Sequence, residues 1–184
     1  MYGVQRVDDR PAYISRLFQL ISNMTGILFV CTGNMYRSPL AAAFFRGQLD
    51  ANGIKNWVVD SAGTWTQSGQ PVPSETIRAA QKHGVNVEGH LTQVVSAYLL
   101  SRNDLVIVME RGHKEALDHE FPFASGKTYI LSQLADKMFY DVPDPVQSGQ
   151  EIDILASDLR SIVERAYPAI CKLVEEISIP PFQS

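Results

Sequence analysis

The stretch ILFVCTGNMYRSPLAAAFFRGQLDA, residues 27–51, decides how the rest of the chain is interpreted. It opens with four consecutive apolar residues, 27–30, the pattern of a strand that is covered on both faces of a parallel sheet. Ser38 is a suitable helix N-cap and Pro39 a suitable first helical residue, which predicts a helix over residues 38–51. A strand that leads through a short loop into a helix is the start of an α/β fold.

The rest of the chain repeats this alternation. Further apolar runs of strand length cover residues 57–59, 105–109 and 128–131. Helical patterns cover residues 74–83, 111–119 and 151–177, and Pro168 is expected to interrupt or kink the last of them. The order predicts a doubly wound α/β domain whose ligand chemistry lies beyond the carboxyl ends of the strands.

Composition excludes several classes of protein. The 184 residues are 45% hydrophobic and 20% charged, which suits one globular domain. A formal net charge of −4 disfavours a nucleic-acid partner. The two cysteines, Cys31 and Cys171, form neither a disulfide framework nor a four-thiolate zinc site, which favours a reducing, cytoplasmic location. Zinc, Walker and serine-hydrolase motifs are also missing, so no metal or cofactor is expected.

Residues 1–25 are expected to be an extension ahead of a domain at 26–184. An apolar stripe at helical spacing predicts an amphipathic helix over residues 11–24. No signal peptide or membrane-spanning run is recognised. The simplest role for the helix is packing on its own domain. Self-association and docking to a protein partner are the alternatives.

The loop CTGNMYRS, residues 31–38, is suited to bind an oxyanion. A loop between a strand end and a helix N-terminus turns backbone N–H groups inward, and the helix dipole favours negative charge there. Gly33 and Asn34 are residue types that adopt the left-handed backbone conformations of such a loop. The predicted phosphate-binding residues are Thr32, Gly33, Asn34, Met35, Tyr36, Arg37 and Ser38.

Cys31 at the base of this loop is the predicted nucleophile. The donors that bind an anion also stabilise a thiolate, which would make Cys31 reactive at neutral pH. Arg37 offers a planar, permanently charged fork for two phosphoryl oxygens. The Ser38 hydroxyl can donate to the sulfur when it acts as a leaving group. The alternative for Cys31 is a buried, inert thiol.

A general acid is also required, because an alkoxide or phenoxide leaves poorly without a proton. The segment DVPDP, residues 141–145, places Asp144 between two prolines that restrict the backbone on either side. Asp141 is the rival carboxylate. A simple turn is the alternative interpretation of the segment.

These residues carry a family resemblance. The motif VCTGNMYRSP is followed in order by SAGT at 61–64, HGV at 83–85, DLVIVM at 104–109 and PDP at 143–145. The pattern over residues 26–178 resembles the low-molecular-weight protein tyrosine phosphatases. The resemblance implies a four-stranded parallel sheet flanked by helices, with 26–184 as the catalytic domain. It also implies hydrolysis of phosphotyrosine in proteins through a phosphocysteine on Cys31, with Arg37 binding phosphate and Asp144 as general acid and base. It further implies a hydrogen-bonded network that supports the loop, made by Asn34, Ser38, Ser61 and His83.

The sequence departs from this family at two places. Tyr36 stands where a second cysteine is common, so oxidation of Cys31 is expected to pass the sulfenic acid stage more readily. Val146 and Gln147 stand where aromatic residues often line the pocket. Trp65 is then either a pocket aromatic or a partly buried core residue, and the expected pocket wall is Met35, Trp65, Val146 and Gln147.

Three alternative functions stay open. A thiol-dependent arsenate reductase would need further cysteines near Cys31, and the sequence offers none nearby. A phosphoanion-binding regulator without turnover would need Tyr36 to reshape the loop. A phosphoarginine phosphatase is the third alternative, because the resemblance extends to relatives with that activity. Those relatives carry a small polar residue where this chain has Met35, and the bulk of Met35 favours an aryl substrate.

Overall fold

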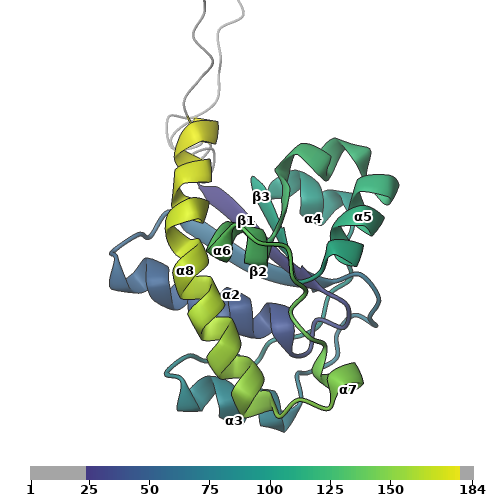
Figure 1. Ribbon diagram of the computed structural model, residues 1–184, viewed down its shortest axis with the longest axis vertical. Coiled ribbons are helices and arrows are strands. Elements are labelled where there is room, and N and C mark those ends of the chain that lie inside the picture. Colours follow the sequence, from purple (N-terminus) through teal and green to yellow (C-terminus); the bar gives the residue numbers. More distant parts are fainter. Residues whose placement is uncertain (1–23, 179–184) are drawn as a thin grey trace, which may run out of the picture.

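The computed structural model describes residues 24–178. Four parallel strands form one sheet in the order β2-β1-β3-β4 (Figure 1). The strands are β1 (Thr25–Cys31), β2 (Trp57–Gly63), β3 (Leu105–Val108) and β4 (Thr128–Ile130). The predicted parallel α/β architecture is therefore confirmed, and each of the four apolar runs contributes one strand.

Successive residues of the central strand β1 face opposite sides of the sheet. Ile27 and Phe29 pack into a core with helices α2 (Arg37–Ala51), α3 (Ser74–Lys82), α6 (Leu131–Asp136) and α8 (Ile152–Ser178). Leu28 and Val30 pack into a second core with helices α4 (Ala97–Arg102) and α5 (Arg111–Glu120). All four side chains are fully buried. Both faces of the sheet are thus covered by helices, which is why the strands are continuously apolar rather than alternating.

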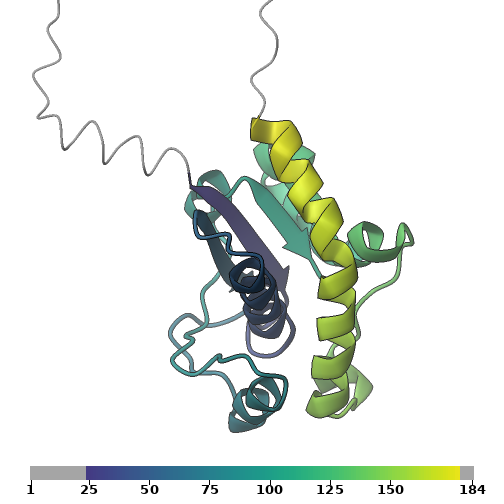
Figure 2. The same cartoon turned by 90° about the vertical axis from the view of Figure 1, so that its left-hand side faces the viewer.

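The helices that cover the sheet differ greatly in length. The α-helices are α2 (Arg37–Ala51), α3 (Ser74–Lys82), α4 (Ala97–Arg102), α5 (Arg111–Glu120), α6 (Leu131–Asp136), α7 (Pro145–Ser148) and α8 (Ile152–Ser178). A 3-10 helix, η1, covers Pro122–Lys127. The long helix α8 lies along one side of the domain beside α2 and α6 (Figures 1 and 2). None of the helices described within residues 24–178 is both long and apolar enough to cross a membrane.

One helix prediction needs correction, and one lies outside the described residues. Helix α2 begins at Arg37, so Ser38 is inside it and is not the N-cap. Its hydroxyl contacts the Cys31 sulfur instead of capping the backbone. Helix α8 continues through Pro168 without interruption, and Figure 2 shows that the helix bends partway along its length. The predicted helix over residues 11–24 falls almost entirely on residues 1–23, which the structure does not describe.

Candidate active site

Cys31 is the last residue of β1 and opens the loop that leads into α2. Its side chain is 2% exposed. The Asn34 backbone N–H donates to the Cys31 Sγ at 3.3 Å, and the Ser38 Oγ lies 3.0 Å from the same sulfur. The sulfur therefore sits at the centre of a loop that supplies hydrogen-bond donors, as an anionic thiolate requires.

Asn34 holds this loop in shape. Its backbone is left-handed, with φ of 54°, as predicted, whereas Gly33 does not adopt a positive φ. The Asn34 Nδ2 donates to the Ser38 Oγ at 3.0 Å and to the Ser61 Oγ at 2.9 Å. Its Oδ1 accepts from the Gln93 backbone N–H at 2.9 Å. One buried amide thus joins the loop to α2, to β2 and to the segment before α4.

The histidine of this network is His90, so the expectation for His83 is wrong. The His90 Nε2 lies 3.2 Å from both the backbone O and the Oδ1 of Asn34. Burial lowers the pKa of His90, which favours the neutral ring as a donor to these oxygens. His83 instead ends α3 and packs edge-on against Phe44, with ring centroids 6.0 Å apart.

Arg37 is buried at the start of α2 and is held from four directions. Its Nη1 donates to the Glu110 carboxylate and to the Val142 carbonyl at 3.0 Å. Its Nη2 donates to the Thr32 Oγ1 at 3.1 Å and to the Asp144 Oδ2 at 2.5 Å. The Arg37 side chain is 2% exposed, so these partners fix its orientation and offset the cost of burying its charge.

Asp144 and Asp141, the two candidate acids, have different positions. Asp144 lies against Arg37 in the pocket and caps the short helix α7, where its Oδ1 accepts from the Val146 N–H at 3.0 Å. Asp141 accepts from the Arg111 N–H at the start of α5, at 2.8 Å. The structure therefore brings Asp144, not Asp141, to Cys31 and Arg37.

His113 on α5 also contacts the loop of residues 31–38. Its Nε2 lies 2.9 Å from the Thr32 Oγ1, which also accepts from Arg37. Burial lowers the pKa of His113, and its Nδ1 has no hydrogen-bond partner among the described residues. Glu110 and Arg37 act on that pKa in opposite directions. A neutral ring is therefore expected beside the arginine.

The pocket over Cys31 has a volume of about 360 Å³. Two of the residues expected in its wall, Trp65 and Val146, are at its rim and are 85% and 75% exposed, so Trp65 is not a core residue. The whole lining is Cys31, Thr32, Gly33, Met35, Tyr36, Arg37, Trp65, Thr66, Gln67, Asp144, Val146 and Gln147. The predicted nucleophile, arginine, acid and wall residues thus meet in one hollow.

Four residues of this site were not predicted from the sequence. Glu110 and His113 follow the apolar run of β3, and their position just beyond a strand's carboxyl end was a usable signal. Gln93 and His90 lie on an irregular segment with no such signal. Gly63 at the end of β2 is also required, because a Cβ there would lie 2.6 Å from the Thr32 carbonyl oxygen.

A buried thiol and a buried arginine, on a loop from a parallel strand into a helix, define a cysteine-based oxyanion site on an α/β fold. The sequence profile of the family "Low molecular weight phosphotyrosine protein phosphatase" matches residues 26–178. The chain belongs to this family.

Individual relatives include enzymes named for two substrates. The low molecular weight protein-tyrosine-phosphatase Etp of Escherichia coli K12 is 33% identical over 68% of this chain and 80% of its own. A protein-arginine-phosphatase of Geobacillus stearothermophilus is 30% identical over 76% of this chain and 91% of its own. The structure of the tyrosine phosphatase Wzb from Escherichia coli K30, in complex with sulphate, aligns with a TM-score of 0.70 at 28% identity. That alignment covers 80% of this chain and 99% of Wzb.

Proposed function

We propose that this protein hydrolyses phosphotyrosine in proteins through a phosphocysteine intermediate on Cys31. The observation that carries the proposal is the meeting of Cys31, Arg37 and Asp144 in one pocket, with Ser38 and a loop amide on the sulfur. Family membership supports the same reaction class. Residues 26–184 are the proposed catalytic domain, and the cytoplasm its proposed location.

The first step transfers the phosphoryl group to sulfur. Arg37 and the N–H groups of residues 32–38 bind the phosphoryl oxygens, and one oxygen takes the place of the Asp144 carboxylate at Arg37 Nη2. The Cys31 thiolate attacks phosphorus while the bond from phosphorus to the tyrosyl oxygen breaks. Asp144, released from Arg37, takes up a proton from solvent as the substrate binds and then gives that proton to the tyrosyl oxygen.

The second step returns the enzyme to its starting state. Water attacks the phosphocysteine, Asp144 takes a proton from that water, and the bond from sulfur to phosphorus breaks. The Ser38 hydroxyl, 3.0 Å from the sulfur, donates to the departing thiolate. Inorganic phosphate leaves, and no cofactor enters the cycle.

Two single substitutions test the roles. Cys31→Ser is expected to abolish turnover of an aryl phosphate while phosphate binding survives, since the loop donors and Arg37 remain. Asp144→Ala is expected to lower kcat by about 10²–10⁴-fold for substrates with poor leaving groups, and less for activated aryl phosphates. Steady-state kinetics against a leaving-group series gives both results. Turnover by Cys31→Ser at the wild-type rate would contradict the mechanism.

Phosphoarginine is the second candidate substrate, because one relative is named a protein-arginine-phosphatase. Met35 lines the pocket of this chain, and its bulk favours a flat aryl group over an extended guanidinium. Matched phosphotyrosyl and phosphoarginyl peptides, compared by kcat/KM, distinguish the two. Arsenate reduction is disfavoured because Cys171 is not among the residues that line the pocket.

A further inference from the structure

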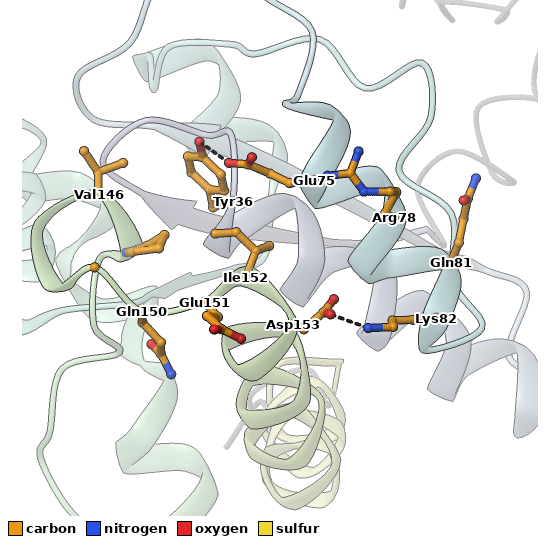
Figure 3. Close-up of a pocket in the computed structure, with 12 residues that line it drawn as sticks. Tyr36, Glu75, Arg78, Gln81, Lys82, Val146, Gln150, Glu151, Ile152 and Asp153 are labelled. Atoms are coloured by element: carbon orange, nitrogen blue, oxygen red, sulfur yellow. Dashed lines mark hydrogen bonds and ion pairs between the residues drawn. The ribbon is translucent and has the colours of Figure 1, made fainter.

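A second hollow of about 760 Å³ adjoins the pocket over Cys31 (Figure 3). Tyr36 and Val146 line both hollows, so the pocket and this groove are neighbours that meet at these two side chains. The groove runs between α3 on one side and α7 with the start of α8 on the other. Its volume is in the range of about 300–1,000 Å³ that is typical of ligand-binding clefts.

Tyr36 forms a fixed ridge between the two hollows. Its hydroxyl donates to the Glu75 Oε1 on α3 at 3.1 Å. Burial and the hydrogen bond to Glu75 both raise the pKa of Tyr36, so the phenol stays protonated as a donor at neutral pH. When the phosphorylated residue of a substrate enters the pocket, the neighbouring part of its chain therefore crosses the Tyr36 ring into the groove.

The charges in the groove are not evenly matched. Lys82 on α3 forms an ion pair with Asp153 on α8, and Glu75 is occupied by Tyr36 (Figure 3). Arg78 on α3 is exposed, and its one hydrogen bond is to the Ser74 Oγ at 3.3 Å. Among the described residues no carboxylate lies within ion-pair distance of Arg78. It is the cation of this groove that is left for a ligand.

We propose that the groove binds the polypeptide that flanks the phosphorylated residue of the substrate, and that Arg78 selects an acidic side chain there. The proposal rests on the proposed phosphatase function. Arg78 follows Glu75 by three residues, so it lies about one helical turn, roughly 5–6 Å, beyond the side chain that holds Tyr36. An extended peptide advances about 3.3 Å per residue, which places the acidic position within about three residues of the phosphotyrosine.

The opposite wall limits how acidic the peptide can be. Glu151 is exposed at the start of α8 and has no cation paired with it among the described residues. A second acidic side chain that faced Glu151 would be repelled. The groove therefore favours one acidic residue on the α3 side rather than an acidic run.

A charge reversal tests this proposal on the full chain. Phosphotyrosyl peptides carrying a single Glu, Gln or Lys at each flanking position are compared by kcat/KM, with p-nitrophenyl phosphate as the probe that does not reach α3. Wild type is expected to prefer Glu over Lys at one position by about two- to fivefold, the effect of one exposed ion pair. Arg78→Glu is expected to reverse that preference and to leave p-nitrophenyl phosphate turnover unchanged.

Arg102→Glu is the matched control, because it makes the same charge change on α4, near Gly26 at the other end of β1. It is expected to keep the wild-type preference. A flat peptide profile, or the same preference in wild type and Arg78→Glu, would overturn the proposal while the phosphatase function stands. Failure of wild type to hydrolyse p-nitrophenyl phosphate and free phosphotyrosine would instead refute the proposed function.

Discussion

Asn34 is the residue on which the shape of the loop of residues 31–38 depends most. The side-chain Nδ2 and Oδ1 and the backbone N–H and O of Asn34 all make hydrogen-bond contacts. Because Asn34 is completely buried, each lost contact leaves a polar group without water to replace it. The finding that His90, and not His83, belongs to this network can therefore be tested by mutation.

His90→Ala is expected to lower the free energy of unfolding by about 1–3 kcal/mol and kcat by about tenfold, since the Asn34 oxygens lose their histidine donor. His83→Ala removes only an edge contact with Phe44 and is expected to leave kcat unchanged. Urea denaturation and aryl phosphate kinetics measure both effects. A larger loss of kcat in His83→Ala than in His90→Ala would contradict the assignment.

Tyr36 allows a second test at the scale of single residues, which concerns the oxidation of Cys31. Its place in the loop lacks the thiol that could trap oxidised Cys31 as a disulfide, and Cys171 does not line the pocket. Tyr36→Cys is expected to let most activity return when peroxide-treated enzyme is reduced with dithiothreitol, whereas wild type loses activity irreversibly at the same dose. Tyr36→Ser serves as the control without a thiol. Equal recovery in all three proteins would count against this expectation.

The reactive residues could be predicted from the sequence because they belong to one short segment or to a proline-flanked aspartate. Cys31, Arg37 and Ser38 are fixed by a single strand-loop-helix unit, so local rules apply to them. His90, Gln93 and Glu110 reach the site only through tertiary packing. Position in the sequence does not encode that packing, and the family resemblance implies His83 of the HGV motif rather than His90, which makes the contact.

At the scale of elements, the segment that carries Asp144 is tied to the helices on either side. The Tyr140 hydroxyl donates to the Asp136 Oδ2 at the end of α6, and the Arg165 Nε on α8 donates to the Asp136 Oδ1 at 2.7 Å. These bonds lower the pKa of Asp136 to about 2. One carboxylate thus joins α6, α8 and the segment that leads to the general acid.

The contribution of these Asp136 interactions to the free energy of unfolding depends on pH. The folded pKa of Asp136 is below the ordinary value of about 3.9, so its contribution is complete above that value and is lost as pH falls toward about 2. Wild type is expected to be more stable than Asp136→Asn at pH 6, with the gap narrowing between about pH 4 and 2. Urea midpoints across this range measure the gap. A constant gap would show that the carboxylate charge is not responsible.

The longer elements were predictable because their patterns span several turns or a whole buried run. The four strands and the helices α2, α3, α5 and α8 all have such patterns. Helices α4, α6 and α7 have only six, six and four residues, too few for a periodic signal. The local capping rule predicts Ser38 as the N-cap, but its hydroxyl contacts Cys31 and Asn34, which are brought to it by the fold of the loop.

At the scale of the whole molecule, an acidic protein binds a dianion through a local arrangement. The formal net charge is −4, and the buried Arg37 already faces the Glu110 and Asp144 carboxylates. Affinity for phosphate must therefore come from the loop N–H groups and from replacing Asp144 at Arg37, rather than from the overall field. The same replacement releases Asp144 for proton transfer, which couples phosphate binding to catalysis.

The central claim is that the phosphoryl group passes through Cys31. Rapid-quench of wild type with a ³²P-labelled phosphotyrosyl peptide, followed by peptide mapping at neutral to alkaline pH, tests it most directly. We expect label on the peptide that contains Cys31 to form and decay during turnover by wild type, and no label that forms and decays in Cys31→Ser. Label on any other residue, or turnover by wild type without a labelled intermediate while Cys31→Ser keeps its activity, would contradict it.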